Sequence, residues 1–408
     1  MPSNLHTAFD YRTNADALFK TKFLKYYENV FNSRRPTWSQ IPKNNTFTSK
    51  KLEFPVPTTY KGGVGSGAIP ESNPATYVRV VLTSKKIYAS DKVDRETIVA
   101  SIGSEAAFVE AISECIKKVV EADTWNHARM LFNDGTGALG TIDTGGVTDN
   151  GSGNYTLVIS SATWKDANWE ENMFVNITSL GTEKFAIQLV DPTTRSVTVQ
   201  RQAGGVQVPS AGDVVYLQGS CNNDIQGLKG VCDATSGTLY EVPVGRKWQA
   251  YQRDANGIGI STPILNKAML SIEKKVGVAP NLVVTSYVQY EKILNLLEDQ
   301  KRYSIATLEP KAPNLKGRVS FQGVLFMSSQ GPVKIFPEQF CEDDRIYFLN
   351  TDHIEYHRRP KSGWVKDDIG GSGYLRVADE DAFEARFATY GELFIAPTYQ
   401  GVVTGLAT

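Results

Sequence analysis

The 408-residue sequence has little cysteine and histidine, two residue types common in metal, redox and catalytic centres. It contains four cysteines and four histidines, and the cysteines form no CxxC pair. Zinc clusters and small disulfide frameworks both depend on characteristic cysteine spacings, so neither is indicated. We interpret the cysteines as reduced and mostly buried. With four histidines, the sequence also offers few candidates for the base of a histidine-based catalytic triad.

Long apolar runs are missing as well. No stretch approaches the ~20 apolar residues that a membrane span requires. The first ten residues are polar, without the basic start and apolar stretch of a secretory signal. We therefore expect a protein that is made in a cytoplasm and has no membrane partner.

Charge is scarce overall and unevenly placed. The formal net charge is -1, which argues against a free nucleic-acid binder. Residues 11–51, however, carry nine Lys or Arg and two Asp or Glu, whereas residues 52–408 sum to -7. A basic arm on a mildly acidic body is the pattern to explain.

The basic arm contains an amphipathic stretch in which Phe19 and Phe23 stand at helical spacing. Arg34, Arg35 and a proline end this stretch, and Trp38 follows shortly after. Such a helix could bind nucleic acid, a membrane surface or a neighbouring subunit, or pack on its own protein. The sequence leaves these alternatives open.

Residues 52–91 are predicted to form a long two-stranded excursion with a glycine-rich tip. The tip contains Gly62, Gly63, Gly65 and Gly67 but lacks both the GxGxxG spacing and a following Gly-Lys-Ser/Thr. Nucleotide binding is therefore disfavoured, and the glycines indicate a flexible loop. The excursion also carries three lysines: Lys61, Lys85 and Lys86.

The strongest helical pattern follows the excursion and runs from about Asp94 to Phe132. A helix of ~30 residues would be ~45 Å long, longer than most compact domains need. Residues 138–219 then change to short alternating strands between turns, which predicts a small all-β barrel or sandwich. We expect this module to fold by itself.

The remainder mixes helices and strands. Residues 261–276 and 287–299 are predicted helices on either side of the strand LVVTS. Further strands are expected at 318–329, at 345–359 and at 382–397. We find no internal repeat and no low-complexity tract.

Two alternative chemistries remain possible on the residues. His353, Glu355 and His357 would share one face of a strand and could bind a metal, although a subunit contact explains them equally well. Paired carboxylates could hydrolyse glycosides. The acidic clusters at 342–344, 367–368 and 379–381 are nevertheless better interpreted as solvated turns between strands.

The order of these segments resembles the HK97-fold major capsid proteins of tailed bacteriophages. The match covers nearly the whole chain, and its most telling part is the ending AFEARFATYGELFIAPTYQGVVTGL. The resemblance implies an α+β capsid fold with an inserted small all-β domain. Its expected parts are an N-terminal arm (1–51), an extended loop (52–91), a peripheral domain with a spine helix (92–137), the inserted domain (138–219), an axial domain (220–340), a return of the peripheral domain (341–396) and an axial end (397–408).

The resemblance implies a structural protein without catalytic residues, cofactor or metal. It would assemble into hexamers and pentamers of a virion shell around double-stranded DNA, without sequence-specific contacts, after synthesis in the bacterial cytoplasm. A separate scaffolding protein, a portal and a decoration protein are possible further partners. Alternatives are an encapsulin-like compartment that encloses protein cargo and a β-rich carbohydrate-binding or hydrolytic protein. The expected subunit contacts are Lys61, Gly62, Gly63, Gly65, Gly67, Lys85 and Lys86 in the loop and Phe19, Phe23, Arg34, Arg35 and Trp38 in the arm.

Overall fold

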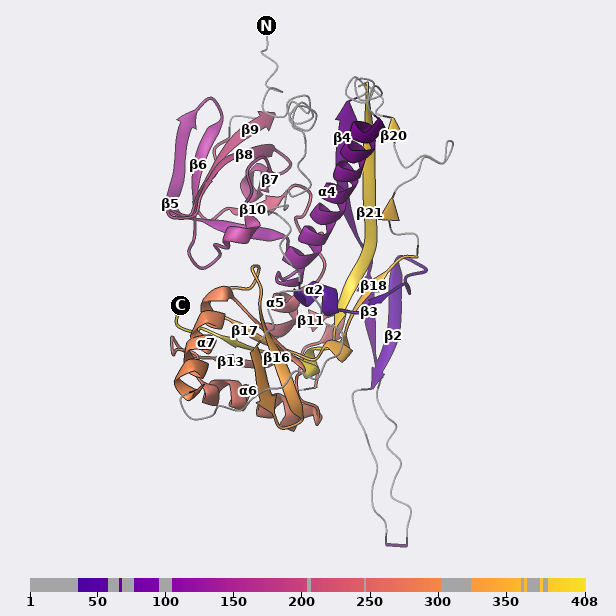
Figure 1. Cartoon of the computed structure of the whole chain (residues 1–408), viewed down its shortest axis with the longest axis vertical. Helices are drawn as coiled ribbons and strands as arrows, with labels where there is room; N and C mark the ends of the chain where they lie inside the picture. Colours follow the sequence, from indigo (N-terminus) through magenta and orange to yellow (C-terminus); the bar gives the residue numbers. More distant parts are fainter. Residues whose placement is uncertain are drawn as a thin grey trace.

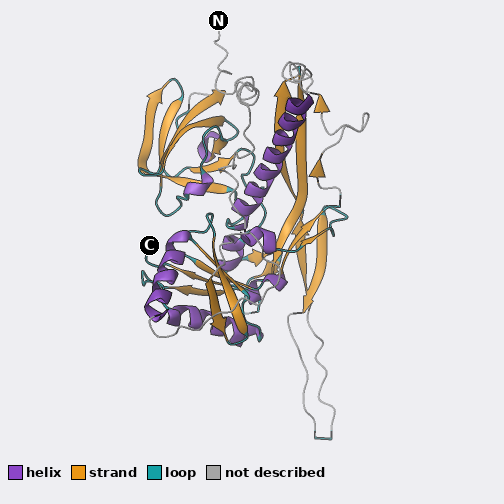
Figure 2. Ribbon diagram, in the orientation of Figure 1, coloured by secondary structure: helices purple, strands orange, loops and turns teal. Residues whose placement is uncertain are grey.

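The computed structural model describes residues 36–57, 66–67, 77–94, 105–203, 207–245, 247–301, 324–360, 363–364, 375–376 and 381–408. The described chain forms three bodies: a long sheet with one long helix, a mixed α/β body and a small barrel (Figure 1). Figure 2 shows that the barrel consists mainly of strands with short helical turns, whereas most of the shorter helices belong to the α/β body. None of the described helices is long and apolar enough to cross a membrane.

The long sheet is built around β21 (Ala382–Ile395). Strand β4 (Lys85–Asp94) pairs along one edge of β21. The other edge receives β18 (Ile354–Arg358), β19 (Gly363–Trp364) and β20 (Leu375–Arg376), and β1 (Lys43–Asn44) adds to β18 in parallel.

Helix α4 (Glu105–Leu131) lies along this sheet (Figure 1). Its 27 residues give a length of ~40 Å, so the predicted long helix is confirmed. Its predicted start at Asp94 is wrong. Residues up to Asp94 pair with β21 through main-chain hydrogen bonds, which commits their backbone groups to a strand.

The predicted excursion begins as a hairpin of β2 (Lys51–Pro57) and β3 (Tyr77–Thr83). Along β2 partly buried and exposed residues alternate, as period-two patterning requires. After Ser84 the chain leaves the hairpin and enters the long sheet as β4. The last seven residues of the predicted extended loop, residues 85–91, are therefore part of that sheet.

The α/β body contains a six-stranded sheet with helices packed on it. Its strands, in spatial order, are β13 (Tyr251–Asp254), β22 (Gly401–Thr404), β17 (Ile346–Leu349), β14 (Leu282–Thr285), β16 (Gly331–Pro337) and β15 (Val324–Ser328). Helices α6 (Thr262–Val276) and α7 (Tyr287–Lys301) share an apolar core with one face of the sheet. These helices and β14 confirm the sequence prediction.

One predicted strand is in fact two strands in different sheets. Residues 345–359 divide at the η4 turn (Thr351–His353), where the Asn350 side chain accepts a hydrogen bond from the N–H of Asp352. Before the turn, β17 is buried along its whole length and pairs with β14 and β22. The chain thus changes sheets at this turn and not at residue 341.

The barrel is closed, with strand order β10-β5-β6-β9-β8-β7. Its strands are β5 (Ala138–Gly151), β6 (Asn154–Ile159), β7 (Phe174–Ile177), β8 (Lys184–Asp191), β9 (Ser196–Ala203) and β10 (Val214–Leu217). The predicted five strands are present, and β5 is a sixth that the glycine-rich sequence concealed. The barrel has an apolar core of its own, centred on Val175, Phe185, Ile187 and Val199.

Candidate assembly surfaces and the barrel neck

The root of the arm is fixed to the body. Helix α2 (Pro36–Gln40) carries Trp38, whose ring lies 4.9 Å from that of His127 and 5.0 Å from that of Tyr356, measured between centroids. The Thr37 hydroxyl donates a hydrogen bond of 3.0 Å to Glu338. Trp38 is only 6% exposed, so its side chain belongs to the chain's own core, not to a surface for a neighbour. The other predicted arm contacts (Phe19, Phe23, Arg34 and Arg35) lie outside the described residues.

The segment after α2 continues the attachment. Strand β1 pairs with β18, and the Asn44 amide donates a 2.7 Å hydrogen bond to Glu355. Phe47 is buried in the main core. We call residues 36–47, which these contacts fix to the body, the strap. Most of the basic arm precedes the strap in the sequence.

The hairpin also has a fixed base. Phe54 of β2 packs edge-on against Phe394 of β21, with ring centroids 4.9 Å apart, and Val80 and Leu82 of β3 are fully buried. Of the predicted tip residues, Gly67 is described: it is exposed, and its φ of +108° is a conformation that favours glycine. Lys61, Gly62, Gly63 and Gly65 lie outside the described residues.

The two lysines at the start of β4 differ in their surroundings. The Lys85 amine donates a 2.9 Å hydrogen bond to the carbonyl of Asn222, within its own chain. Lys86 is exposed opposite Tyr390, and the neighbouring Tyr88 is 56% exposed with its ring 6.1 Å from that of Tyr390. Lys86 is therefore the better placed of the two for a contact with another molecule.

The barrel joins the body through two linkers that touch one another, and we call residues 132–137 and 218–227 the neck. The N–H of Asn222 donates a 2.8 Å hydrogen bond to the carbonyl of Thr136. A Cβ atom on Gly137 would lie 2.3 Å from the Ser220 carbonyl oxygen, so only glycine allows this approach.

Buried charges lie beside the neck. Arg129, in the last turn of α4, is fully buried and forms an ion pair of 2.9 Å with Asp224. Glu392 of β21 accepts hydrogen bonds from the N–H groups of Gln226 (2.8 Å) and Leu393 (3.1 Å). Burial raises the pKa of Glu392 to about 7, although these two donors oppose the rise.

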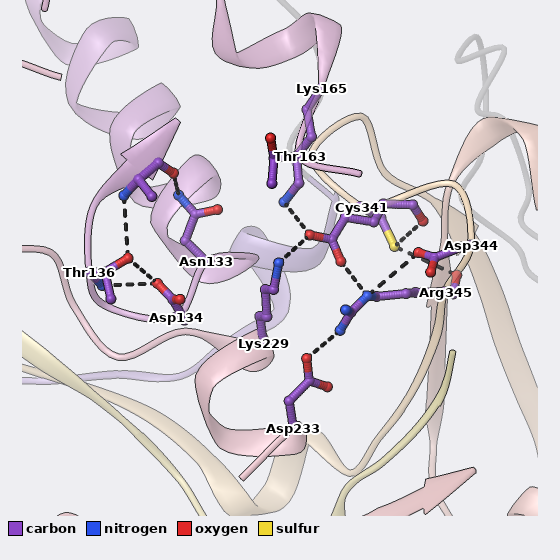
Figure 3. Close-up of polar contacts among 12 residues, drawn as sticks. Asn133, Asp134, Thr136, Thr163, Lys165, Lys229, Asp233, Cys341, Asp344 and Arg345 are labelled. Carbon is purple, nitrogen blue, oxygen red and sulfur yellow. Dashed lines mark hydrogen bonds and ion pairs between the residues drawn. The ribbon is translucent and has the colours of Figure 1, made fainter. Parts of the chain in front are cut away.

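A second group of charges connects the barrel, α5 (Leu228–Cys232) and the loop before β17 (Figure 3). At its centre Glu342 is 2.7 Å from the amine of Lys229, 3.5 Å from that of Lys165, and also paired with Arg345. Asp233 completes the group by pairing with Arg345. Burial alone would raise the pKa of Glu342, but the three cations hold it below its usual value. We call these five residues the Glu342 cluster.

Lys165 is the barrel's contribution to this cluster. It stands just before the η2 turn (Asp166–Asn168), and its side chain is 7% exposed. Burial lowers the pKa of Lys165, and Glu342 opposes that shift. A cavity of about 50 Å³ lies beside it, lined by Lys165, Lys229, Glu342, Asn168 and neighbouring residues.

The alternative metal site does not form. His353 belongs to η4 and its ring stacks on Tyr399 at 3.5 Å, whereas the Nδ1 atom of His357 is 2.7 Å from the Thr46 hydroxyl. Within the described ranges, no three His, Cys, Asp or Glu side chains are grouped so that they could hold a metal ion. Among the cysteines with described side chains, Cys232 and Cys341 are buried, as expected, but Cys221 is exposed.

The acidic clusters need one correction. Glu342 was interpreted as part of a solvated turn, but its side chain is 10% exposed and fully engaged with cations. No sequence pattern marks Arg129, Asp224, Lys165 or Glu392 as members of a buried charge pair or hydrogen-bonded group. Their partners lie far away in sequence, so local spacing carries no signal for them.

No protein-family model and no curated protein sequence matches the chain. Several solved structures do match the chain. The Cyanophage A-1(L) capsid asymmetric unit is similar with a TM-score of 0.55 at 12% identity, over 96% of this chain and 98% of that chain. The holo encapsulin complex from Synechococcus elongatus gives 0.47 at 6% identity over 97% and 95%, and the capsid of an empty GTA particle gives 0.46 at 8% over 97% and 98%. The chain has an HK97-like capsid fold.

Proposed function

We propose that this chain is the major capsid protein of a tailed bacteriophage and assembles as hexamers and pentamers into a shell around double-stranded DNA. The observation that carries the proposal is the similarity to the cyanophage capsid over nearly the full length of both chains. The protein acts as a structural unit of the virion wall, and its principal partners are copies of itself. A scaffolding protein, a portal and a decoration protein are further proposed partners.

The attachments of the arm and the hairpin support this function. Both segments are rooted in the main core, through Trp38 and Phe47 for the arm and through Phe54 and Leu82 for the hairpin. Each root is therefore held by buried apolar contacts. A segment with such a root can add buried area on a neighbouring copy without unfolding its own subunit. We propose Lys61, Gly62, Gly63, Gly65, Gly67 and Lys86 as contacts of the hairpin and Phe19, Phe23, Arg34 and Arg35 as contacts of the arm.

The charge distribution favours the same contact. The basic arm and the mildly acidic remainder of the chain attract one another between copies. A heterologous contact that repeats with closed rotational symmetry gives a ring of subunits, and such rings can then pack together into a closed shell. Salt should weaken assembly, because exposed charges are screened at high ionic strength.

Assembly of the purified chain tests the proposal. The full chain, with and without its scaffolding protein, is examined by negative-stain microscopy and light scattering. A variant that begins at Pro36 keeps α2 and Trp38, so it should fold but fail to close shells. Closed particles from the full chain, but not from the truncated variant, support the proposal. A full chain that stays a monomer of 44.9 kDa under every condition tried refutes it.

Nucleic acid content separates a virion from an encapsulin-like compartment. Particles purified from cells that produce the complete virion are treated with nuclease and then opened. Protected double-stranded DNA supports a phage capsid. Protein cargo without DNA would establish the compartment instead.

A further inference from the structure

The described barrel is connected to the body by little besides its neck. Its six strands pair only with one another, and its apolar core is separate from the two cores of the body. The η2 turn contacts the body: Ala167 packs on the main core and Lys165 reaches Glu342. The described barrel is thus a closed unit with its own core that meets the body at the neck and at the η2 turn.

The neck has the backbone composition of a hinge. Gly135, Gly137 and Gly219 have φ angles of +84°, +83° and +77°, and Asn222 has +56°. Glycine has many conformations available at small cost, so rotation about the three glycines needs no side chain to be forced into a strained state. Because the two linkers lie side by side, the barrel can turn about the neck while keeping its internal packing.

The docking contact combines the small apolar contact of Ala167 with the ion pair of Lys165 and Glu342. Lys165 is buried with Glu342 as its anionic partner in the cluster, beside a cavity of about 50 Å³ that is large enough for water. Burying an ammonium group costs hydration free energy, and pairing with a carboxylate offsets that cost only in a good geometry. If the barrel turns away, Lys165 regains water while Glu342 keeps Lys229 and Arg345.

We propose that the barrel is a hinged unit, which turns about the neck and is held in the docked orientation by the Lys165–Glu342 contact. Docked and turned-out orientations are then close in free energy, because hydration of Lys165 compensates for the lost ion pair while Lys229 and Arg345 still neutralise Glu342. In a shell the same chain occupies rings of different size, and a barrel with two orientations can meet different neighbours. That role in the shell rests on the proposed function, whereas the hinge itself is a property of the single chain.

Distances between two spin labels in the unassembled full chain test the hinge. Gln188→Cys places one label on the exposed face of β8, Lys267→Cys places the other on the exposed face of α6, and Cys221→Ser removes the exposed native thiol. Single-label samples report any labelling of the remaining cysteines. The two distances are compared in this background and with Lys165→Glu, which sets a second carboxylate against Glu342. Lys184→Glu, an exposed barrel residue with the same charge change, is the matched control.

We expect the Lys165→Glu chain to lose the docked distance in favour of a longer or broader distribution, and the Lys184→Glu chain to keep it. The amides of the neck, including that of Asn222, should exchange about tenfold faster in Lys165→Glu, while barrel amides keep their protection. Glu342→Gln should also favour the turned-out state, because it leaves Lys165 beside the cations Lys229 and Arg345 without their shared carboxylate. This variant tests the hinge if Lys165→Glu misfolds. A docked distance retained in a folded Lys165→Glu or Glu342→Gln chain would refute the hinge, whatever the assembly experiment shows.

Discussion

Replacement of Trp38 by alanine should detach the strap that anchors the arm. A buried tryptophan removes about 150–250 Å² from water, which at ~25 cal/mol per Å² is worth about 4–6 kcal/mol. Measured aromatic-to-alanine changes in cores cost about 3–5 kcal/mol. Trp38 is 6% exposed and packs on His127 and Tyr356, so we expect Trp38→Ala to lower the free energy of unfolding by about 3–5 kcal/mol.

Urea unfolding of the unassembled chain, followed by circular dichroism, measures this loss. Circular dichroism avoids the change in fluorescence that removal of a tryptophan itself causes. Tyr77→Ala is the control: this aromatic residue is 62% exposed, and its loss should change the free energy of unfolding by no more than ~0.5 kcal/mol.

Amide exchange locates the effect of Trp38→Ala. Protection should fall first in residues 36–47, because their burial depends on the tryptophan. A loss below ~1 kcal/mol together with unchanged exchange in residues 36–47 would contradict the reasoning, since the strap would then be held by other contacts.

Three further predictions concern the neck and the barrel. The raised pKa of Glu392 means that between pH 4.5 and about 7 the folded chain holds a proton that the unfolded chain releases, so the free energy of unfolding should fall as pH rises through this window. Glu392→Gln should remove this pH dependence and, at ~1.36 kcal/mol per pKa unit, raise the free energy of unfolding by up to ~3 kcal/mol at pH 8. Urea unfolding at pH 5 and pH 8 measures both effects. Gly137→Ala should cost about 2 kcal/mol or more, because its Cβ would meet the Ser220 carbonyl, whereas Gly145→Ala, with a φ of +71° and open space around it, should cost only about 1 kcal/mol. The fragment 138–219 should be soluble and give a dispersed amide spectrum because the barrel has its own core; precipitation would show that the body is needed to cover it.

The sequence was informative wherever the structure depends on neighbours along the chain. Helix α6 begins after Ser261 and ends before Gly277, and its buried residues Ile264, Leu265, Ala268 and Ile272 follow helical spacing. The barrel strands alternate in the same direct way: Val175 and Ile177 point into the core, whereas Asn176 between them is partly exposed. Such patterns come from a single face turned toward a core, and they are visible without knowing what covers that face.

The sequence was uninformative where a choice depends on distant partners. The segment IYFL reads as a strand, but only its pairing with β14 and β22 assigns it to the α/β body, while β18 five residues after its end joins the long sheet. Lys85–Asp94 was likewise divided between loop and helix, because pairing with β21 is a property of the C-terminal strand. Sheet membership is a long-range choice that local propensity does not encode.

The ion pairs at the junction show the same limit in the candidate site, and they also suggest why the site has this chemistry. Lys165, Lys229 and Glu342 come from three separate parts of the chain, and Arg129 and Asp224 from two more. Apolar side chains at these positions would hold the barrel more firmly, because buried ion pairs contribute little net stability. A buried ion pair instead favours one relative orientation of its two charges. A buried charge without its partner costs free energy, whereas a charge that is exposed to water does not. Charge at the junction of a hinged barrel therefore defines the docked orientation and still permits release, whereas the apolar anchors at Trp38 and Phe54 serve segments whose roots do not move.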